Sequence, residues 1–67
     1  MNKELLRSVM ALHGETNKDL ANLLEKTEQS ISAKLNENGT EFKQGEIAKI
    51  RKHYKLNPDQ VTEIFFS

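Results

Sequence analysis

Residues 17–38, NKDLANLLEKTEQSISAKLNEN, decide the fold of this 67-residue chain, because they combine two helical patterns with a strong start signal between them. Apolar side chains recur at the three- and four-residue spacing of an α-helix, at Leu20, Ala21, Leu23, Leu24, Ile31 and Leu35. The stretch therefore predicts two short helices that are held across a tight turn.

Thr27 lies between the two patterns and is suited to begin the second helix. Its hydroxyl oxygen can accept a hydrogen bond from a backbone N–H two or three residues later, so we expect a helix from Glu28 to Leu35. Two helices that cross closely need a small side chain at the crossing, and Ala21 supplies one for Ile31 to pack over. The face of the second helix away from Ile31 is left free to contact a partner.

Two runs of the chain resemble a known family of DNA-binding proteins. Residues 18–39, KDLANLLEKTEQSISAKLNENG, resemble the helix-turn-helix of Cro and repressor proteins of lambdoid and related phages and of the xenobiotic-response-element group. In that family a Ser or Thr caps the recognition helix and a Gln-Ser-Ile or Ser-Thr-Ile run follows, a pattern matched by Thr27, Gln29, Ser30 and Ile31. Residues 42–66, FKQGEIAKIRKHYKLNPDQVTEIFF, resemble the fourth and fifth helices of phage-type members.

The resemblance implies both a fold and a function. The implied fold is all-α, a compact five-helix repressor-like domain whose second and third helices form the helix-turn-helix. The implied function is that of a sequence-specific transcriptional regulator, which reads the major groove of operator DNA with residues 28–35.

The resemblance and the chemistry of the side chains together predict the DNA contacts. We expect base contacts from Glu28, Gln29, Ser32 and Ala33. We expect phosphate contacts from Asn17, Lys18, Thr27, Ser30, Lys34, Thr40 and Lys43. Gln29 is the strongest candidate, because its amide can pair bidentately with adenine, whereas Glu28 can accept from a cytosine amino group and Lys34 can neutralise a phosphate. Helix capping is the alternative role for Asn17, and a solvated turn is the alternative for residues 36–43.

The chain departs from the family pattern at two places. The family usually has Gly at the turn followed by an apolar residue, where this chain has Glu25 and Lys26, so we expect a small strain or a slightly different turn. Three positions after the isoleucine, where the family usually has an apolar residue, this chain has Lys34. Leu35 follows it and lies on the same helical face as Ile31.

The charge balance argues against tight binding of DNA by a single copy. The chain is formally neutral, and residues 17–43 contain four lysines and five carboxylates, a net charge of −1. Affinity for duplex DNA depends largely on Lys and Arg at phosphates, so a homodimer is needed to double the contacts. The alternative is a protein-binding modulator or antirepressor, whose helix-turn-helix surface engages the basic surface of a phage repressor protein.

The rest of the chain predicts three further helices and one domain over residues 1–67. We expect a first helix over residues 2–13, capped by Asn2 and stopped at Gly14, with an apolar stripe of Leu5, Leu6, Val9, Met10 and Leu12. Thr16 or Asn17 caps the second helix. The fourth helix covers residues 44–54, and Asn57 with Pro58 begins the fifth. Phe42 is expected to return the chain to the core.

Two features of the C-terminal half have more than one interpretation. The basic run over residues 49–55 is either an electrostatic footprint for a polyanion or the charged outer face of a helix. Phe65 and Phe66 either close the core or leave one ring exposed as a patch for a dimer.

Composition excludes several classes of function at this stage. There is no cysteine, and His13 and His53 lie far apart without ligand-spaced partners, so we expect no metal, no cofactor and no catalytic constellation. No apolar run approaches the ~20 residues that span a bilayer, and the N-terminus lacks a signal-peptide core. We therefore expect a cytoplasmic protein without a membrane or a small-molecule substrate as partner. The resemblance to phage regulators implies a bacterial host and association with the nucleoid.

Overall fold

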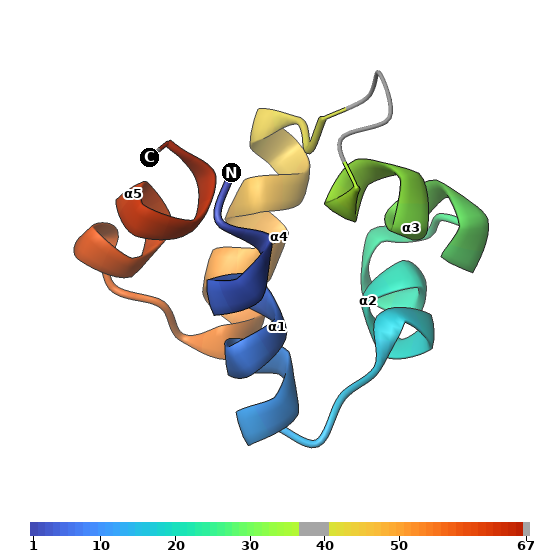
Figure 1. Ribbon diagram of the computed structural model, residues 1–67, viewed down its shortest axis with the longest axis horizontal. Helices are drawn as coiled ribbons and strands as arrows, with labels where there is room; N and C mark the ends of the chain where they lie inside the picture. Colours follow the sequence, from blue (N-terminus) through green and yellow to red (C-terminus); the bar gives the residue numbers. More distant parts are fainter. Residues whose placement is uncertain (37–40, 67) are drawn as a thin grey trace.

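Five α-helices make up the part of the chain that the structure describes, residues 1–36 and 41–66 of a computed structural model (Figure 1). They are α1 (Lys3–Leu12), α2 (Asn17–Leu24), α3 (Glu28–Leu35), α4 (Gln44–Tyr54) and α5 (Pro58–Phe65). No strand occurs among the described residues, and the predicted all-α fold is confirmed.

The helix starts follow from the capping residues in the sequence. The backbone N–H of Leu5 donates to Asn2 Oδ1 at 3.1 Å, and that of Ser30 donates to Thr27 Oγ1 at 3.1 Å. Asn57 accepts from the N–H of Gln60 at 2.8 Å in the same way, with a proline at the first position of α5. Each cap satisfies an N–H that has no partner inside its own helix, so the predicted starts of α1, α3 and α5 are confirmed.

Three residues end helices in the left-handed backbone conformation. Gly14 follows α1 with φ +66°, whereas Glu25 and Lys55 adopt φ 57° and 55° at the ends of α2 and α4. A side chain makes this conformation costly, by roughly 1–2 kcal/mol. The strain expected at the turn between α2 and α3 therefore lies at Glu25, while the backbone N–H of Lys26 closes the end of α2 by donating to Ala21 O at 2.9 Å.

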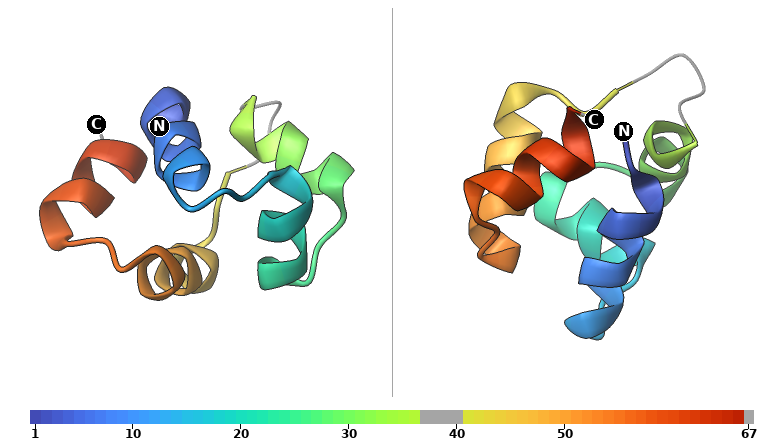
Figure 2. Two further views of the ribbon diagram at one scale, coloured as in Figure 1. Left: turned by 90° about the horizontal axis from the view of Figure 1, so that it is seen from below. Right: turned by 60° about the vertical axis from the view of Figure 1, so that its left-hand side comes forward.

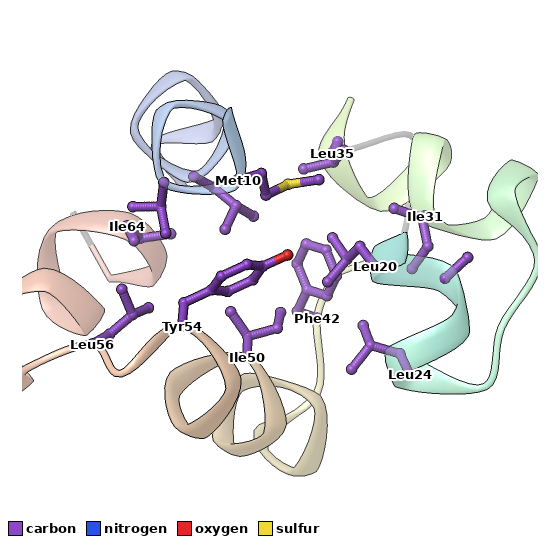
Figure 3. Close-up of a cluster of buried hydrophobic side chains, with 13 residues drawn as sticks. Met10, Leu20, Leu24, Ile31, Leu35, Phe42, Ile50, Tyr54, Leu56 and Ile64 are labelled. Carbon is purple, nitrogen blue, oxygen red and sulfur yellow. The ribbon is translucent and has the colours of Figure 1, made fainter. Parts of the chain in front are cut away.

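One hydrophobic core joins all five helices (Figure 3). Its fully buried side chains are Leu6, Leu20, Ile31, Leu35, Ile50 and Ile64. Ala21 and Ile31 are both buried where α2 meets α3, as the small residue in α2 predicted, and Phe42 is buried as expected. The expected inward position of Leu12 is wrong, because this side chain is 86% exposed at the last residue of α1.

α1 and α5 lie side by side, α2 packs against α3, and α4 contacts both α2 and α5 (Figures 1 and 2). The N–H of Asn2 donates to the carbonyl oxygen of Ile64 at 2.7 Å, which holds the start of α1 against α5. α5 and α3 lie on opposite sides of the molecule (Figure 2). Phe65 is half-buried and Phe66 is 67% exposed, so one of the two terminal rings lies outside the core.

Among the described residues no helix has the length and apolar character that crossing a membrane requires.

Candidate functional site

A shallow, open groove lies where the N-terminus of α2 meets the outer side of α3. It is lined by Thr16, Asn17, Lys18, Glu28, Gln29 and Ser32. Five of the residues predicted to contact DNA are thereby gathered on one surface, although they come from two helices. All of these side chains are exposed except that of Asn17, which is half-buried.

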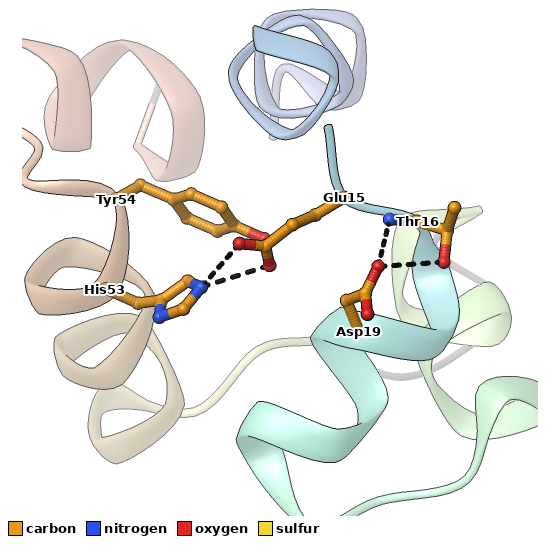
Figure 4. A network of polar contacts seen from close by, with 5 residues as sticks. All are labelled: Glu15, Thr16, Asp19, His53 and Tyr54. Atoms are coloured by element: carbon orange, nitrogen blue, oxygen red, sulfur yellow. Dashed lines mark hydrogen bonds and ion pairs between the residues drawn. The ribbon is translucent and has the colours of Figure 1, made fainter. Parts of the chain in front are cut away.

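Local hydrogen bonds fix the start of α2 at this groove. The backbone N–H of Thr16 donates to Asp19 Oδ2 at 2.8 Å, and the Thr16 hydroxyl donates to the same oxygen at 3.2 Å (Figure 4). The cap belongs to Thr16, so Asn17 is the first residue of the helix and its side chain is not needed for capping. The positive end of the α2 dipole therefore lies beside Asn17 and Lys18.

The remaining residues of the predicted surface lie around the groove rather than in it. Thr27 is exposed and uses its hydroxyl oxygen as the cap of α3, which occupies the N–H of Ser30. Ser30 and Ala33 are half-buried, and Lys43 is exposed before α4. Thr40 lies outside the described residues.

Lys34 was predicted to contact a phosphate, but the structure places its side chain in the interior and not on this surface. The side chain is 7% exposed, and its Nζ lies 2.7 Å from both carboxylate oxygens of Glu46. The same Nζ lies 5.7 Å from the centre of the Phe42 ring. Lys34 follows Ile31 by three residues, so it faces inward like Ile31, and its charge is already neutralised by a carboxylate of α4.

Glu46 is the partner of Lys34, and no pattern in the sequence indicated it. It is buried and bonded to both Lys34 and the backbone N–H of Lys43, the latter at 2.8 Å. Burial by itself raises the pKa of Glu46, but hydrogen bonds from Lys34 and Lys43 and the charge of Lys34 outweigh it, and the pKa lies below its usual 4.5. The pair connects α3 to α4 from inside.

The lowered pKa of Glu46 makes a prediction about acid stability. Because the folded state holds the carboxylate ionised, its contribution to stability is complete above pH 4.5 and is lost as the pH falls through the lower, folded-state pKa. The side-chain carboxyl carbon of Glu46 in isotope-labelled protein should titrate with a midpoint below 4.5. A midpoint at or above 4.5 would show that Lys34 does not stabilise the carboxylate.

A second polar network joins the connection between α1 and α2 to the end of α4 (Figure 4). The carboxylate oxygens of Glu15 lie 2.8 and 3.0 Å from His53 Nε2, and Tyr54 Oη donates to Glu15 at 3.2 Å. Burial, and then the charge and hydrogen bond of Glu15, raise the pKa of Tyr54. The His13 ring packs edge-on against Tyr54, 5.1 Å between centroids. Because Glu15 precedes Thr16, this network positions the start of α2.

The structure also changes the charge available at the predicted surface. With Lys34 paired inside, the exposed cations among the described residues of 17–43 are Lys18, Lys26 and Lys43. The exposed carboxylates there are Asp19, Glu25, Glu28 and Glu41. In residues 1–36 and 41–66, His, Asp and Glu form no group of three suited to hold a metal ion.

Comparison of the chain with protein-family models, with curated proteins and with solved structures finds no match.

Proposed function

We propose that the chain is a sequence-specific DNA-binding transcriptional regulator, which inserts α3 into the major groove of operator DNA. The observation that supports this most is the shared groove, in which the start of α2 and the exposed side of α3 present Asn17, Lys18, Glu28, Gln29 and Ser32 together. A short helix that projects polar side chains, with a second helix start beside it, suits one groove of DNA and the adjoining phosphate backbone.

Each side chain has a role that its chemistry allows. Gln29 pairs with adenine through its amide, and Glu28 accepts a hydrogen bond from cytosine. Ser32 reaches a base edge, and the methyl group of Ala33 suits the methyl group of thymine. Asn17 and Lys18 hold a phosphate at the positive end of the α2 dipole.

Further phosphate contacts come from the rim of this surface. Thr27, Ser30 and Lys43 supply hydroxyl and ammonium donors there. The number of free cations is small, and it is smaller than the sequence suggested because Lys34 is occupied by Glu46. A homodimer compensates for this, since two copies at half-sites one helical turn apart double the phosphate contacts.

Replacement of Gln29 by Ala tests this function most sharply. The best operator is first selected from a pool of random duplexes. We expect the preference of the protein for this operator over a mixed-sequence duplex to fall by about 1–3 kcal/mol, because the bidentate adenine contact is lost. Gln44→Ala is the matched control, since Gln44 is an exposed glutamine on α4, away from the groove. Equal loss in the two variants, or in neither, would exclude Gln29 as a base contact.

Lys18→Ala is expected to act on affinity without changing sequence preference. Removing one phosphate contact should weaken binding to all duplexes alike and reduce the slope of log K against log salt by about 1. Lys52→Ala, an exposed lysine of α4, is the control and should leave the slope unchanged. The same slope for both variants would mean that Lys18 lies outside the DNA interface.

The alternative function is that of a modulator that binds a repressor protein through the same surface. The observation in its favour is the excess of exposed carboxylates over cations in the described part of residues 17–43. Under this alternative, Glu28→Lys slows association with a basic repressor surface, whereas under the first it strengthens binding to DNA of any sequence. The direction of the change in DNA affinity distinguishes the two.

A further inference from the structure

A second groove, open to solvent, runs between α4 and α5 and encloses about 520 Å³. Its α4 side is a single stripe of residues three or four apart, formed by Gln44, Ile47, Ala48, Arg51, Lys52 and Lys55. Leu56 and Val61 form the opposite wall. Ile47, Ala48 and Val61 form the apolar part of the lining, called the floor below. Arg51, Lys52 and Lys55 form its basic part.

The positive charge of this neutral chain is concentrated along this helix. Residues 44–56 contain four cations and one carboxylate, which gives this segment a net charge of +3 and leaves −3 for the rest of the chain. Glu46 is turned inward to Lys34, and no carboxylate lines the groove. Within residues 1–36 and 41–66, Arg51, Lys52 and Lys55 form no ion pair.

Helix electrostatics explain part of this pattern. Cations in the last turn of a helix interact favourably with the negative end of its dipole, which accounts for basic residues near the end of α4. The dipole does not account for the apolar strip beside them, where Ile47 and Val61 are half-buried and Ala48 is exposed. An apolar strip beside unpaired cations suits a ligand that carries both apolar and acidic groups.

We propose that the α4–α5 groove binds an acidic amphipathic helix of a partner protein. The apolar face of such a helix covers Ile47, Ala48 and Val61, and its carboxylates pair with Lys52 and Lys55. A DNA backbone satisfies the cations but offers no extended apolar surface to the floor. This chain's own α5 carries Asp59 and Glu63, but its Ile64 is buried in the core, so a second folded copy cannot present the apolar face of that helix.

The proposed groove is independent of the DNA-binding function. It lies between α4 and α5, whereas α3 lies on the side of the molecule opposite α5 (Figure 2). A partner helix in the groove therefore leaves α3 accessible, and the chain can hold DNA and an acidic protein segment together. The loss of one activity does not imply the loss of the other.

The test uses ¹⁵N-labelled protein and a synthetic helical peptide with Leu at helical spacing on one face and Glu elsewhere. We expect amide shifts confined to residues 44–61. Lys52→Glu combined with Lys55→Glu should lower the affinity at least tenfold, and Ala48→Glu should also lower it by placing a carboxylate on the apolar floor. Lys26→Glu combined with Lys49→Glu is the matched control, because both lysines are exposed and lie outside this groove.

Four results would overturn the proposal. One is an equal loss of affinity in the control pair, which would indicate general attraction between opposite charges. Another is equal binding of a peptide of the same composition with its Leu residues scrambled, which would exclude the apolar floor. A third is the absence of shifts at residues 44–61, and the fourth is a duplex DNA that shifts these amides at lower concentration than the peptide. The exposed positions of all five substituted residues keep the fold intact, which the dispersion of the amide spectrum verifies.

Discussion

Glu46→Gln should lower the free energy of unfolding by about 3–5 kcal/mol, because it leaves the ammonium group of Lys34 buried without an opposite charge. A domain of this size is expected to be stable by roughly 3–10 kcal/mol, so the variant should unfold at a much lower urea concentration. Glu4→Gln is the control, since Glu4 is exposed and lies 3.8 Å from Arg7, and it should change stability by less than about 0.5 kcal/mol.

The double variant Lys34→Met with Glu46→Gln separates the interaction energy of the pair from the effect of each single substitution. Removing both charges leaves no unpaired ion in the interior, so the double variant should be more stable than Glu46→Gln alone. Urea unfolding of the wild type, the two single variants and the double variant gives the coupling energy. Additive losses would contradict an interaction between the two side chains, and Lys34 would again be available to a phosphate.

Ile31→Ala should lower the free energy of unfolding by about 2–5 kcal/mol, because Ile31 is fully buried where α3 packs against α2. Ile31→Val removes a single methylene and should cost about 0.5–1.5 kcal/mol. Ser32→Ala, at the neighbouring exposed position, should stay within about 0.5 kcal/mol of the wild type. Urea unfolding compares the three variants.

The relative size of these three losses of unfolding free energy shows whether Ile31 anchors α3. If Ile31→Ala cost no more than Ser32→Ala, then α3 would not be anchored through Ile31. The relative positions of α2 and α3, on which the groove between Lys18 and Gln29 depends, would need a different explanation.

The sequence predicted most of the fold because the signals for it are local. Thr27 and Asn57 cap their helices with side chains that reach three residues along the chain, and the helices begin where these residues indicate. Helical spacing identified much of the core, including Ile31 and Leu35, because buried residues recur at that spacing on each helix. The prediction that Leu12 faces the core was wrong for a local reason as well, because Leu12 is the last residue of α1 and its side chain is exposed there.

The polar pairs that join distant segments were not predicted, because their members are far apart in the sequence. Lys34 and Glu46 are 12 residues apart, and Glu15 and His53 are 38 residues apart, so no periodicity connects them. One signal was nevertheless present for the first pair. Lys34 occupies a position where the resembled family usually has an apolar residue, and a charged lysine buried on the inner face of a helix is stabilised by a carboxylate partner.

Only the part of the candidate site that depends on local sequence spacing was predicted. Glu28, Gln29 and Ser32 are exposed along one side of α3, which helical spacing alone indicates. The proximity of Asn17 and Lys18 to them is a result of packing between α2 and α3. The charge of the surface depended on where Lys34 points, which the sequence did not reveal.

DNA binding at the groove between α2 and α3 can be tested by titrating ¹⁵N-labelled protein with mixed-sequence duplex DNA. Salt of about 50 mM is low enough for even a few phosphate contacts to be detected. If DNA binds in this groove, the backbone amides of Asn17, Lys18 and residues 27–33 should shift, and those of α5 should not. Unchanged amides at these positions, or shifts confined to residues 44–61, would contradict it.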